Sequence, residues 1–306
     1  MTDKRTEMKV VIGTRGSELA LWQAYFVESE LKKIGVKVEI KIIKTQGDII
    51  THLSFDKMEG KGFFTKEIEA ALLSKSIDLA VHSHKDLETT SPKGLIIAAV
   101  SEREDPSDML LINKKSFDGS LDLSVKKNAV IGTSSARRQT QLLSFRPDIE
   151  LKDLRGNVQT RMQKLRDGNY DAIMLATAGM ERLKVDLSEF EIKKFNPNEF
   201  VPAPAQGVLG LQIREEDKEL FDLLQKHLHY KEVEDCITEE RKVLKALDGG
   251  CQLPLGSYCE KTSNGFQLKI SLGQKEGGVI RLSAEGDSTK GLADKVLSDL
   301  KKKRLV

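Results

Sequence analysis

The chain has 306 residues, of which 39% are hydrophobic and 31% charged, and its formal net charge at pH 7 is +2. This length exceeds what one hydrophobic core usually organises, so two or three domains are expected. The near-neutral charge and an aromatic content of 5% argue against a nucleic-acid binder that relies on bulk charge and base stacking. Any recognition of anions must therefore be local.

The sequence also bears on the compartment. It has no run of 18 apolar residues, and its first residues, MTDKRTEMKVVIG, lack the apolar stretch of a signal peptide. The three cysteines, Cys236, Cys251 and Cys259, form no CxxC pair, which is typical of a reducing compartment and predicts no zinc site. We expect a cytoplasmic protein that binds neither membranes nor nucleic acid.

The first hundred residues predict alternating strands and helices, with Ser17 as a helix N-cap. Strands are expected at 8–13, 36–42, 78–82 and 95–100, and helices after Ser17 and at 63–74. The polar run His82-Ser83-His84-Lys85-Asp86 directly follows the third strand. Open α/β sheets bind ligands at the carboxyl ends of their strands, so this run is a candidate site. The glycine-bearing segment 55–62, with Lys57 and Lys61, is expected to be a mobile loop.

Arginine gathers in the stretch from Ile131 to Arg161. Its arginines are Arg137, Arg138, Arg146, Arg155 and Arg161. A strand, turn, helix pattern occurs twice there, with Thr133-Ser134-Ser135 before the first helix and Gly156-Asn157 before the second. Helix N-termini offer unpaired N–H groups, and a guanidinium group binds a carboxylate or phosphate at two points. The stretch predicts an anion site, and the alternative is two solvated helix faces.

The remaining elements continue the α/β pattern and end in a separate helical and strand-bearing segment. A Pro- and Asn-containing linker is expected at 195–204, followed by Ala205-Gln206-Gly207 and an apolar run back into compact structure. Strands are expected at 171–175, 266–272 and 279–284, and helices through Arg182 and at 215–227, 231–247 and 290–301. The helix at 231–247 is expected to stop before Gly249-Gly250.

A few groups outside the arginine stretch could carry chemistry. Asp86 is a candidate acid/base or charge-stabilising group, although an ion pair with Lys85 is the alternative. Cys251 follows two glycines in a loop, where an exposed thiol would be reactive, and the alternative is an inert thiol. His82 and His84 lack a third ligand nearby, so no metal is expected. No glycine-rich phosphate motif occurs, so neither ATP nor NAD is expected.

Nine ordered motifs make the sequence resemble a known family. They are TRGSELALWQA, GKGFFTKEIE, VHSHKD, EREDP, GTSSARRQ, LRGNVQTR, YDAIMLATAG, PAQG and GGCQLPLGSY. In this order and spacing, from about Lys9 to Tyr258, they strongly resemble the porphobilinogen deaminase family, also called hydroxymethylbilane synthases. The resemblance implies an α/β fold with three domains: two periplasmic-binding-protein-like lobes flanking a cleft, and a smaller C-terminal α/β domain that carries the cofactor cysteine. It implies domains at 6–104 with 203–225, 105–202 and 226–306, in a monomer.

The resemblance also implies a function in tetrapyrrole and heme biosynthesis. Members of the family deaminate porphobilinogen and join four molecules head to tail onto a covalently bound dipyrromethane cofactor, after which hydrolysis releases hydroxymethylbilane. Cys251 matches the cysteine that carries the cofactor through a thioether, and Asp86 matches the catalytic aspartate. We expect a buried Asp86 carboxylate to point at pyrrole N–H groups and stabilise the cationic intermediate.

Further family positions bind the acetate and propionate groups of the rings. Those positions match Arg15, Ser17, Lys85, Thr133, Ser135, Arg137, Arg138, Arg155, Gly156 and Arg161. Ser83 and Gln206 match substrate-contacting residues, and Arg182 matches an arginine at the edge of the cleft. Lys57 and Lys61 fall in the loop that covers the family's active site. His84 and Glu88 depart from the family pattern, which usually has an apolar residue and a proline there.

Two other function classes compete with this interpretation. A non-enzymatic anion-binding protein related to two-lobed solute receptors explains the arginines and the lobes equally well, but it needs neither Cys251 nor Asp86. A phosphoryl-transfer enzyme would need a metal-binding carboxylate cluster or a phosphate loop, and the sequence predicts neither.

Overall fold

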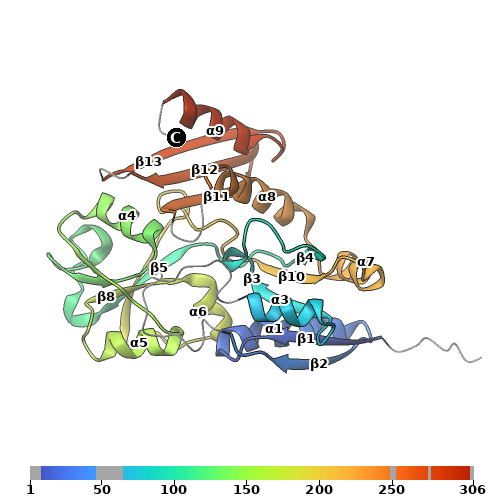
Figure 1. Ribbon diagram of the computed structural model, residues 1–306. Helices are drawn as coiled ribbons and strands as arrows, with labels where there is room; N and C mark the ends of the chain where they lie inside the picture. Colours follow the sequence, from blue (N-terminus) through green and yellow to red (C-terminus); the bar gives the residue numbers. More distant parts are fainter. Residues whose placement is uncertain (1–7, 46–64, 249–252, 275–276, 304–306) are drawn as a thin grey trace, which may run out of the picture. The chain divides into compact units, whose positions relative to one another are not determined.

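The computed structural model describes residues 8–45, 65–248, 253–274 and 277–303 (Figure 1). Contacts among these residues divide the chain into two compact units. The described parts of unit 1 are 8–45, 65–102 and 208–231, and the rest of the described chain forms unit 2. The chain therefore passes from unit 1 into unit 2 at 102/103, returns at 207/208 and passes over again at 231/232.

Unit 1 contains a mixed sheet of five strands in the order β2-β1-β3-β10-β4. The strands are β1 (Lys9–Thr14), β2 (Lys37–Ile42), β3 (Leu79–Ser83), β4 (Leu95–Val100) and β10 (Leu209–Arg214). β1 is parallel to β2 and β3, whereas β10 is antiparallel to both β3 and β4. β10, which is the last of these strands in the sequence, therefore lies between β3 and β4 and not at an edge of the sheet.

Helices pack on both faces of this sheet. They are α1 (Glu18–Lys33), α3 (Lys66–Leu73) and α7 (Lys218–His227). Val81 of β3 packs with residues of α1 and α7, whereas its neighbour Ala80 packs with residues of α3, because successive strand residues point to opposite faces. Ser17 caps α1 as predicted, accepting a hydrogen bond from Ala20 N. The sheet is thus covered on both sides, and its strand ends remain available for a site.

Unit 2 contains a second five-stranded sheet with the same pattern, in the order β7-β6-β8-β5-β9. Its strands are β5 (Asp108–Asn113), β6 (Val130–Gly132), β7 (Glu150–Lys152), β8 (Ala172–Ala176) and β9 (Phe190–Lys194), and its helices are α4 (Ala136–Phe145), α5 (Val158–Arg166) and α6 (Thr177–Leu183). β6 is parallel to β7 and β8, and β5 is antiparallel to β8 and β9. In each sheet the inner antiparallel strand begins soon after the chain enters that unit: β10 follows the passage at 207/208, and β5 follows the passage at 102/103.

A smaller C-terminal α/β domain completes unit 2. It consists of β11 (Leu255–Thr262), β12 (Gly265–Gly273), β13 (Val279–Gly286), α8 (Lys231–Ala246) and α9 (Leu292–Lys302). The antiparallel strands form a sheet in the order β11-β12-β13, over which α9 packs (Figure 1). At Gly256 a Cβ atom would lie 2.5 Å from the Val201 carbonyl oxygen. Glycine at this position therefore lets β11 approach the segment around Val201 closely, and so joins the C-terminal domain to the lobe of unit 2 that contains the five-stranded sheet.

The predicted α/β class, with two lobes and a smaller C-terminal α/β domain, is confirmed. The predicted domain boundaries stay a prediction. Sequence patterns miss β5, β9 and β11, and they indicate β10 only as an apolar run. No helix in the described part of the chain is long and apolar enough to cross a membrane.

Candidate functional site

A pocket in unit 1 lies beyond the carboxyl end of β3, close to the N-terminal ends of α1 and α3. Its polar lining residues include Arg15, Ser17, Thr65, His82, Ser83 and Asp86. Its empty volume is about 490 Å³, part of which is open solvent. The structure therefore brings together four residues that the family resemblance singles out: Arg15, Ser17, Ser83 and Asp86. Lys85 lies next to them in the chain, in the turn that follows β3.

Asp86 reaches this pocket because β3 ends at Ser83 and the chain turns into a 3₁₀ helix, His84–Asp86. The turn is held by hydrogen bonds from His84 N to Val208 O (2.9 Å) and from Leu87 N to His84 O (3.2 Å). It leaves the His84 side chain buried and the Asp86 side chain exposed. The expectation of a buried Asp86 carboxylate is therefore wrong.

His82 is buried and connected to residues far away in the sequence. Its Nε2 lies 3.0 Å from Gln212 Oε1, and Gln212 Nε2 donates to Glu69 Oε1 at 3.1 Å. Because the Gln212 amide oxygen can only accept, this network assigns the ring proton to Nε2 and leaves Nδ1 as an acceptor. Burial lowers the pKa of His82 to about 4, against the opposing effect of the Gln212 hydrogen bond. The pocket is thus lined by a neutral histidine.

The side chain of Ser83 points to the face of the sheet opposite to that of His82, and a residue of α1 orients it there. Gln23 of α1, which is buried, donates from Nε2 to Ser83 Oγ at 2.8 Å. Sequence reasoning did not single out Gln23 or Gln212. The sequence does contain one sign of their role: both are polar residues at positions that face the core, and a buried polar side chain needs a hydrogen-bonding partner. Both glutamines hold residues of the β3 end in place.

In unit 2 the predicted anion-binding residues gather around two turns. Thr133 and Ser135 lie in the turn from β6 to α4, and Gly156 lies in the turn from β7 to α5. The missed residue Ser134 joins these turns, because its Oγ accepts from Leu154 N (3.0 Å) and donates to Leu154 O (3.2 Å). The two turns that the repeated pattern predicted are therefore neighbours.

The two helices begin differently. No side-chain hydrogen bond caps α4 at Ser135, whereas the side chain of Asn157 caps α5 by accepting from Thr160 N at 2.9 Å. Arg161 Nε donates to Gly156 O at 2.8 Å, so part of its guanidinium group is used within its own turn. Gly156 has a φ of +108°, and a Cβ there would lie 2.6 Å from Thr160 Cγ2, so this turn requires glycine.

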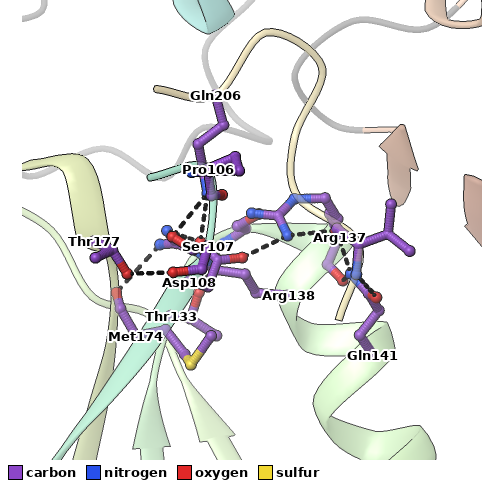
Figure 2. Close-up of polar contacts among 12 residues, drawn as sticks. Pro106, Ser107, Asp108, Thr133, Arg137, Arg138, Gln141, Met174, Thr177 and Gln206 are labelled. Carbon is purple, nitrogen blue, oxygen red and sulfur yellow. Dashed lines mark hydrogen bonds and ion pairs between the residues drawn. The ribbon is translucent and has the colours of Figure 1, made fainter. Parts of the chain in front are cut away.

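Two predicted arginines and Gln206 meet at a buried carboxylate that sequence reasoning missed, Asp108 (Figure 2). Arg137 Nη1 donates to Asp108 Oδ2 at 2.7 Å, and Arg138 Nη2 donates to Asp108 Oδ1 at 2.7 Å. Gln206 Nε2 donates to the same Oδ1 at 2.9 Å. We call Asp108, Arg137 and Arg138 the buried ion triad. Burial by itself raises the pKa of Asp108, but the two guanidinium groups outweigh it and hold this pKa far below its usual range.

The remaining predicted residues have other surroundings. Arg155 is half-buried, and its carbonyl accepts from Lys164 Nζ at 3.2 Å. Arg182 is buried and donates from Nη2 to Gly207 O at 2.7 Å, at the point where the chain leaves unit 2. Cys251, Lys57 and Lys61 lie outside the described residues. Within the described ranges, no group of three or more His, Cys, Asp or Glu residues is arranged to hold a metal ion.

Comparison with known families finds two matching models. One, described as porphobilinogen deaminase, dipyromethane cofactor binding domain, matches residues 10–222, and one described as porphobilinogen deaminase, C-terminal domain, matches residues 235–302. A curated porphobilinogen deaminase of Nitratidesulfovibrio vulgaris (strain DP4) is 44% identical over 95% of this chain and 93% of its own. That of Chlorobium phaeovibrioides is 42% identical over 88% of this chain and 84% of its own.

Solved structures with a similar course of the chain include solute-binding proteins. A probable amino-acid ABC transporter extracellular-binding protein from Bacillus subtilis has a TM-score of 0.44 at 12% identity, covering 72% of this chain and 90% of its own. An ancestral arginine-binding protein bound to arginine has a TM-score of 0.40 at 17% identity, also covering 72% of this chain and 90% of its own.

Proposed function

This chain belongs to the porphobilinogen deaminase family, and on that basis we propose how its own residues perform the family's reaction. The enzyme deaminates porphobilinogen, joins four molecules head to tail on a dipyrromethane cofactor and releases hydroxymethylbilane. Membership of this enzyme family removes the alternatives of a non-enzymatic anion-binding protein and of a phosphoryl-transfer enzyme.

The residues of unit 2 have the chemistry that a dipyrromethane needs. Its two rings carry acetate and propionate groups, and unit 2 offers the Arg137–Arg138 pair beside the N-terminus of α4, which has no side-chain cap. The hydroxyl groups of Thr133 and Ser135 lie at the same turn. When bound, the cofactor supplies the covalently held primer to which pyrrole units are added. We assign these residues to its carboxylates and Cys251 to its attachment.

In unit 1 we assign the substrate to the pocket at the end of β3. Arg15 and the N-terminus of α1 supply positive charge for the acetate and propionate groups of porphobilinogen. Asp86 supplies a carboxylate at the same pocket, where it accepts hydrogen bonds from pyrrole N–H groups. Loss of ammonia leaves positive charge on the pyrrole, and a fixed carboxylate stabilises that charge as it develops. The presence of Asp86 and Arg15 in one pocket is the observation that carries this assignment.

The test of this assignment is Asp86→Asn, which removes the negative charge and keeps the size of the side chain. Turnover of porphobilinogen should fall by about 10²- to 10³-fold, the usual cost of removing one electrostatic group from an active site. Because Asp86 is exposed, the unfolding temperature should not change. Glu88→Gln, which neutralises an exposed carboxylate two residues away, is the matched control and should keep its activity. Near-normal turnover of Asp86→Asn would overturn the assignment.

The assignment of Cys251 has a separate test that does not depend on activity. The intact mass of the denatured protein, after incubation with porphobilinogen, should exceed the sequence mass by two linked pyrrole units. Cys251→Ala should show the bare sequence mass under the same treatment, whereas Cys259→Ala, which alters a buried thiol of the C-terminal domain, should keep the excess. An excess that persists in Cys251→Ala would place the attachment elsewhere.

We also propose that the enzyme is a cytoplasmic monomer. The buried thiols of Cys236 and Cys259 are free, which suits a reducing compartment. Light scattering should give a mass near 34.2 kDa. A mass twice as large would contradict the monomer.

A further inference from the structure

We propose that Asp108 is a positioning residue of this enzyme: its carboxylate, which Arg138 also holds, presents the Arg137 guanidinium group to a carboxylate of the cofactor or the growing pyrrole chain. The proposal rests on the proposed function of Arg137 as a carboxylate-binding group. Neither the family resemblance nor the sequence pattern assigns a role to Asp108.

Asp108 has a rigid base. It is the first residue of β5, an inner strand, where it pairs with Ala176 of β8, and its carbonyl accepts a hydrogen bond from Phe195 N at 3.0 Å. Its exposed fraction is 0%. A side chain held by an inner strand positions its partners more accurately than one on a loop.

The carboxylate of Asp108 and two backbone carbonyls together orient both arginines. Arg137 Nη1 bonds to Asp108 Oδ2 and, at 2.9 Å, to Val201 O. Arg138 bonds to Asp108 Oδ1 through Nε and Nη2, and its Nη1 donates to Met174 O at 3.2 Å (Figure 2). Each guanidinium group is therefore fixed by bonds in two directions, which determines the direction of its plane.

Arg137 keeps donors for a ligand. Among the residues that the structure describes, its side-chain hydrogen bonds all run from Nη1. Its Nε and Nη2 edge is the edge that binds a carboxylate at two points. Because Asp108 and Val201 occupy Nη1, they direct this opposite edge away from themselves. Asp108 thus decides which part of Arg137 a ligand carboxylate meets.

Asp108 also sets the charge of the buried ion triad. Two adjacent buried guanidinium groups without a counterion would repel each other and would be costly to desolvate. With Asp108 ionised, the triad carries a formal charge of +1, which one ligand carboxylate neutralises. Gln206 adds a mechanical link, because its Nε2 donates both to Asp108 Oδ1 and to Pro106 O, at 2.9 and 2.7 Å. The triad is thereby joined to the segments of unit 2 next to the passages at 102/103 and 207/208.

The test compares Asp108→Asn, Asp108→Glu and a matched control, Asp171→Asn. Asp171 is a mostly buried carboxylate of the same lobe that binds Ser116 Oγ, Val130 N and Lys126 Nζ, so its loss weakens the lobe without touching the arginines. For each variant we would measure the unfolding temperature, KM and kcat for porphobilinogen, and, from the intact mass, the fraction of chains carrying two pyrrole units after incubation with porphobilinogen.

Asp108→Asn should raise KM about tenfold or more and lower the cofactor-bearing fraction, because a misplacement of about 1 Å in a binding group can cost that much. Asp171→Asn should lower the unfolding temperature and leave KM and the cofactor-bearing fraction unchanged. If Asp108→Asn does not fold, Asp108→Glu decides, because it keeps the charge and displaces it by one methylene. It should fold and show the same two losses. Wild-type KM and cofactor loading in a folded Asp108 variant would overturn the proposal.

Arg137→Gln separates this proposal from the one on which it rests. If Arg137→Gln raises KM and a folded Asp108 variant does not, only the positioning role of Asp108 fails. If Arg137→Gln also leaves KM and cofactor loading unchanged, then the carboxylate-binding role of the arginine fails as well.

Discussion

His82 and Ser83 are neighbours on β3 that the fold connects to different elements. Because successive strand residues point to opposite faces, Ser83 meets Gln23 of α1, while His82 meets Gln212 of β10. Two amides thus orient the side chains on either side of one strand end. Single buried glutamines, rather than charged groups, control the hydrogen-bonding direction of the pocket residues next to Asp86.

The neutral state of His82 predicts how stability depends on pH. The pKa of His82 falls from its ordinary 6.5 to about 4 on folding. Between pH 6.5 and pH 4 the unfolded chain binds a proton that the folded chain does not, so a fall in pH favours unfolding. The contribution of neutral His82 to the free energy of unfolding is therefore complete above pH 6.5 and is lost as the pH falls towards 4. The loss is about 3 kcal/mol in the free energy of unfolding. Chemical unfolding of wild type and His82→Gln at several pH values between 7.5 and 4 would measure it.

The variant should lose less stability than wild type across this range, because glutamine does not titrate. His227→Gln, which removes an exposed histidine at the end of α7, should keep the wild-type slope. Equal slopes for His82→Gln and wild type would show that His82 takes up its proton equally well in the folded chain.

Turns govern the geometry at the scale of elements, and Gly207 shows how. It lies where the chain leaves unit 2 and has a φ of +88°, and its carbonyl oxygen accepts a hydrogen bond from Glu104 N at 3.1 Å. A Cβ on Gly207 would lie 2.4 Å from Glu104 O. The close approach of the two chain segments at the passages therefore requires a residue without a side chain.

Gly207→Ala should destabilise the protein more than Gly35→Ala does. Gly35, after α1, has a similar φ of +85°, but a Cβ there meets nothing within 4 Å. Alanine at either position costs about 1 kcal/mol for its left-handed backbone, and at Gly207 the steric overlap adds about 1–3 kcal/mol. Urea unfolding midpoints of the two variants would show the difference. Equal midpoints would mean that the Glu104 segment moves aside without cost.

The sequence predicts elements where the pattern is local and fails where the partner is distant. The strand at 95–100 and the cap at Ser17 follow from apolar runs and N-cap chemistry, and both are confirmed. β5 was missed because its apolar residues resemble any buried segment, and only pairing with β8 and β9 makes them a strand. The prediction that Asp86 is buried was wrong because the end of β3 depends on a bond to Val208.

The candidate site shows the same division. Motifs identify donors such as Arg137 and Gln206, but they do not identify the acceptor that gathers them. Asp108 precedes Arg137 by 29 residues and Gln206 by 98, so no local spacing connects them. Likewise Ser134 bonds to Leu154, 20 residues later. The family resemblance thus names the residues that we propose to contact ligands, and the fold shows which residues orient them.

At the scale of the whole molecule, Glu240 of α8 joins the passages to the C-terminal domain. Its exposed fraction is 0%, and its oxygens accept from Arg103 Nη1 (2.6 Å), Ala205 N (2.7 Å) and Cys259 N (2.8 Å). Arg103 and Ala205 belong to the two segments that adjoin the passages. α8 ends at Ala246, five residues before Cys251. The helix that leads to the proposed attachment cysteine is therefore anchored by one carboxylate.

Glu240→Gln should destabilise unit 2 by about 3–5 kcal/mol, the usual cost of removing one partner from a buried ion pair. Calorimetry of the purified enzyme would detect this as a lower unfolding temperature. The double variant Arg103→Met/Glu240→Leu should recover part of the loss, because it leaves no unpaired buried charge. Lys242→Met, which removes the α8 side of an exposed ion pair with Asp294 of α9, should have little effect. A Glu240→Gln protein as stable as wild type would contradict the anchoring role.

The position of β10 also determines the order in which a growing polypeptide can complete its sheets. The five strands of the first sheet of unit 2 lie within residues 108–194, so that sheet can close as soon as this segment leaves the ribosome. Unit 1 begins earlier but must wait for residue 214, because β10 is the strand between β3 and β4. During that interval the nascent chain carries two apolar strands with unpaired edges, which is when a chaperone would be needed. The lobe that contains Asp86 starts first and finishes after the lobe that contains Arg137 and Arg138.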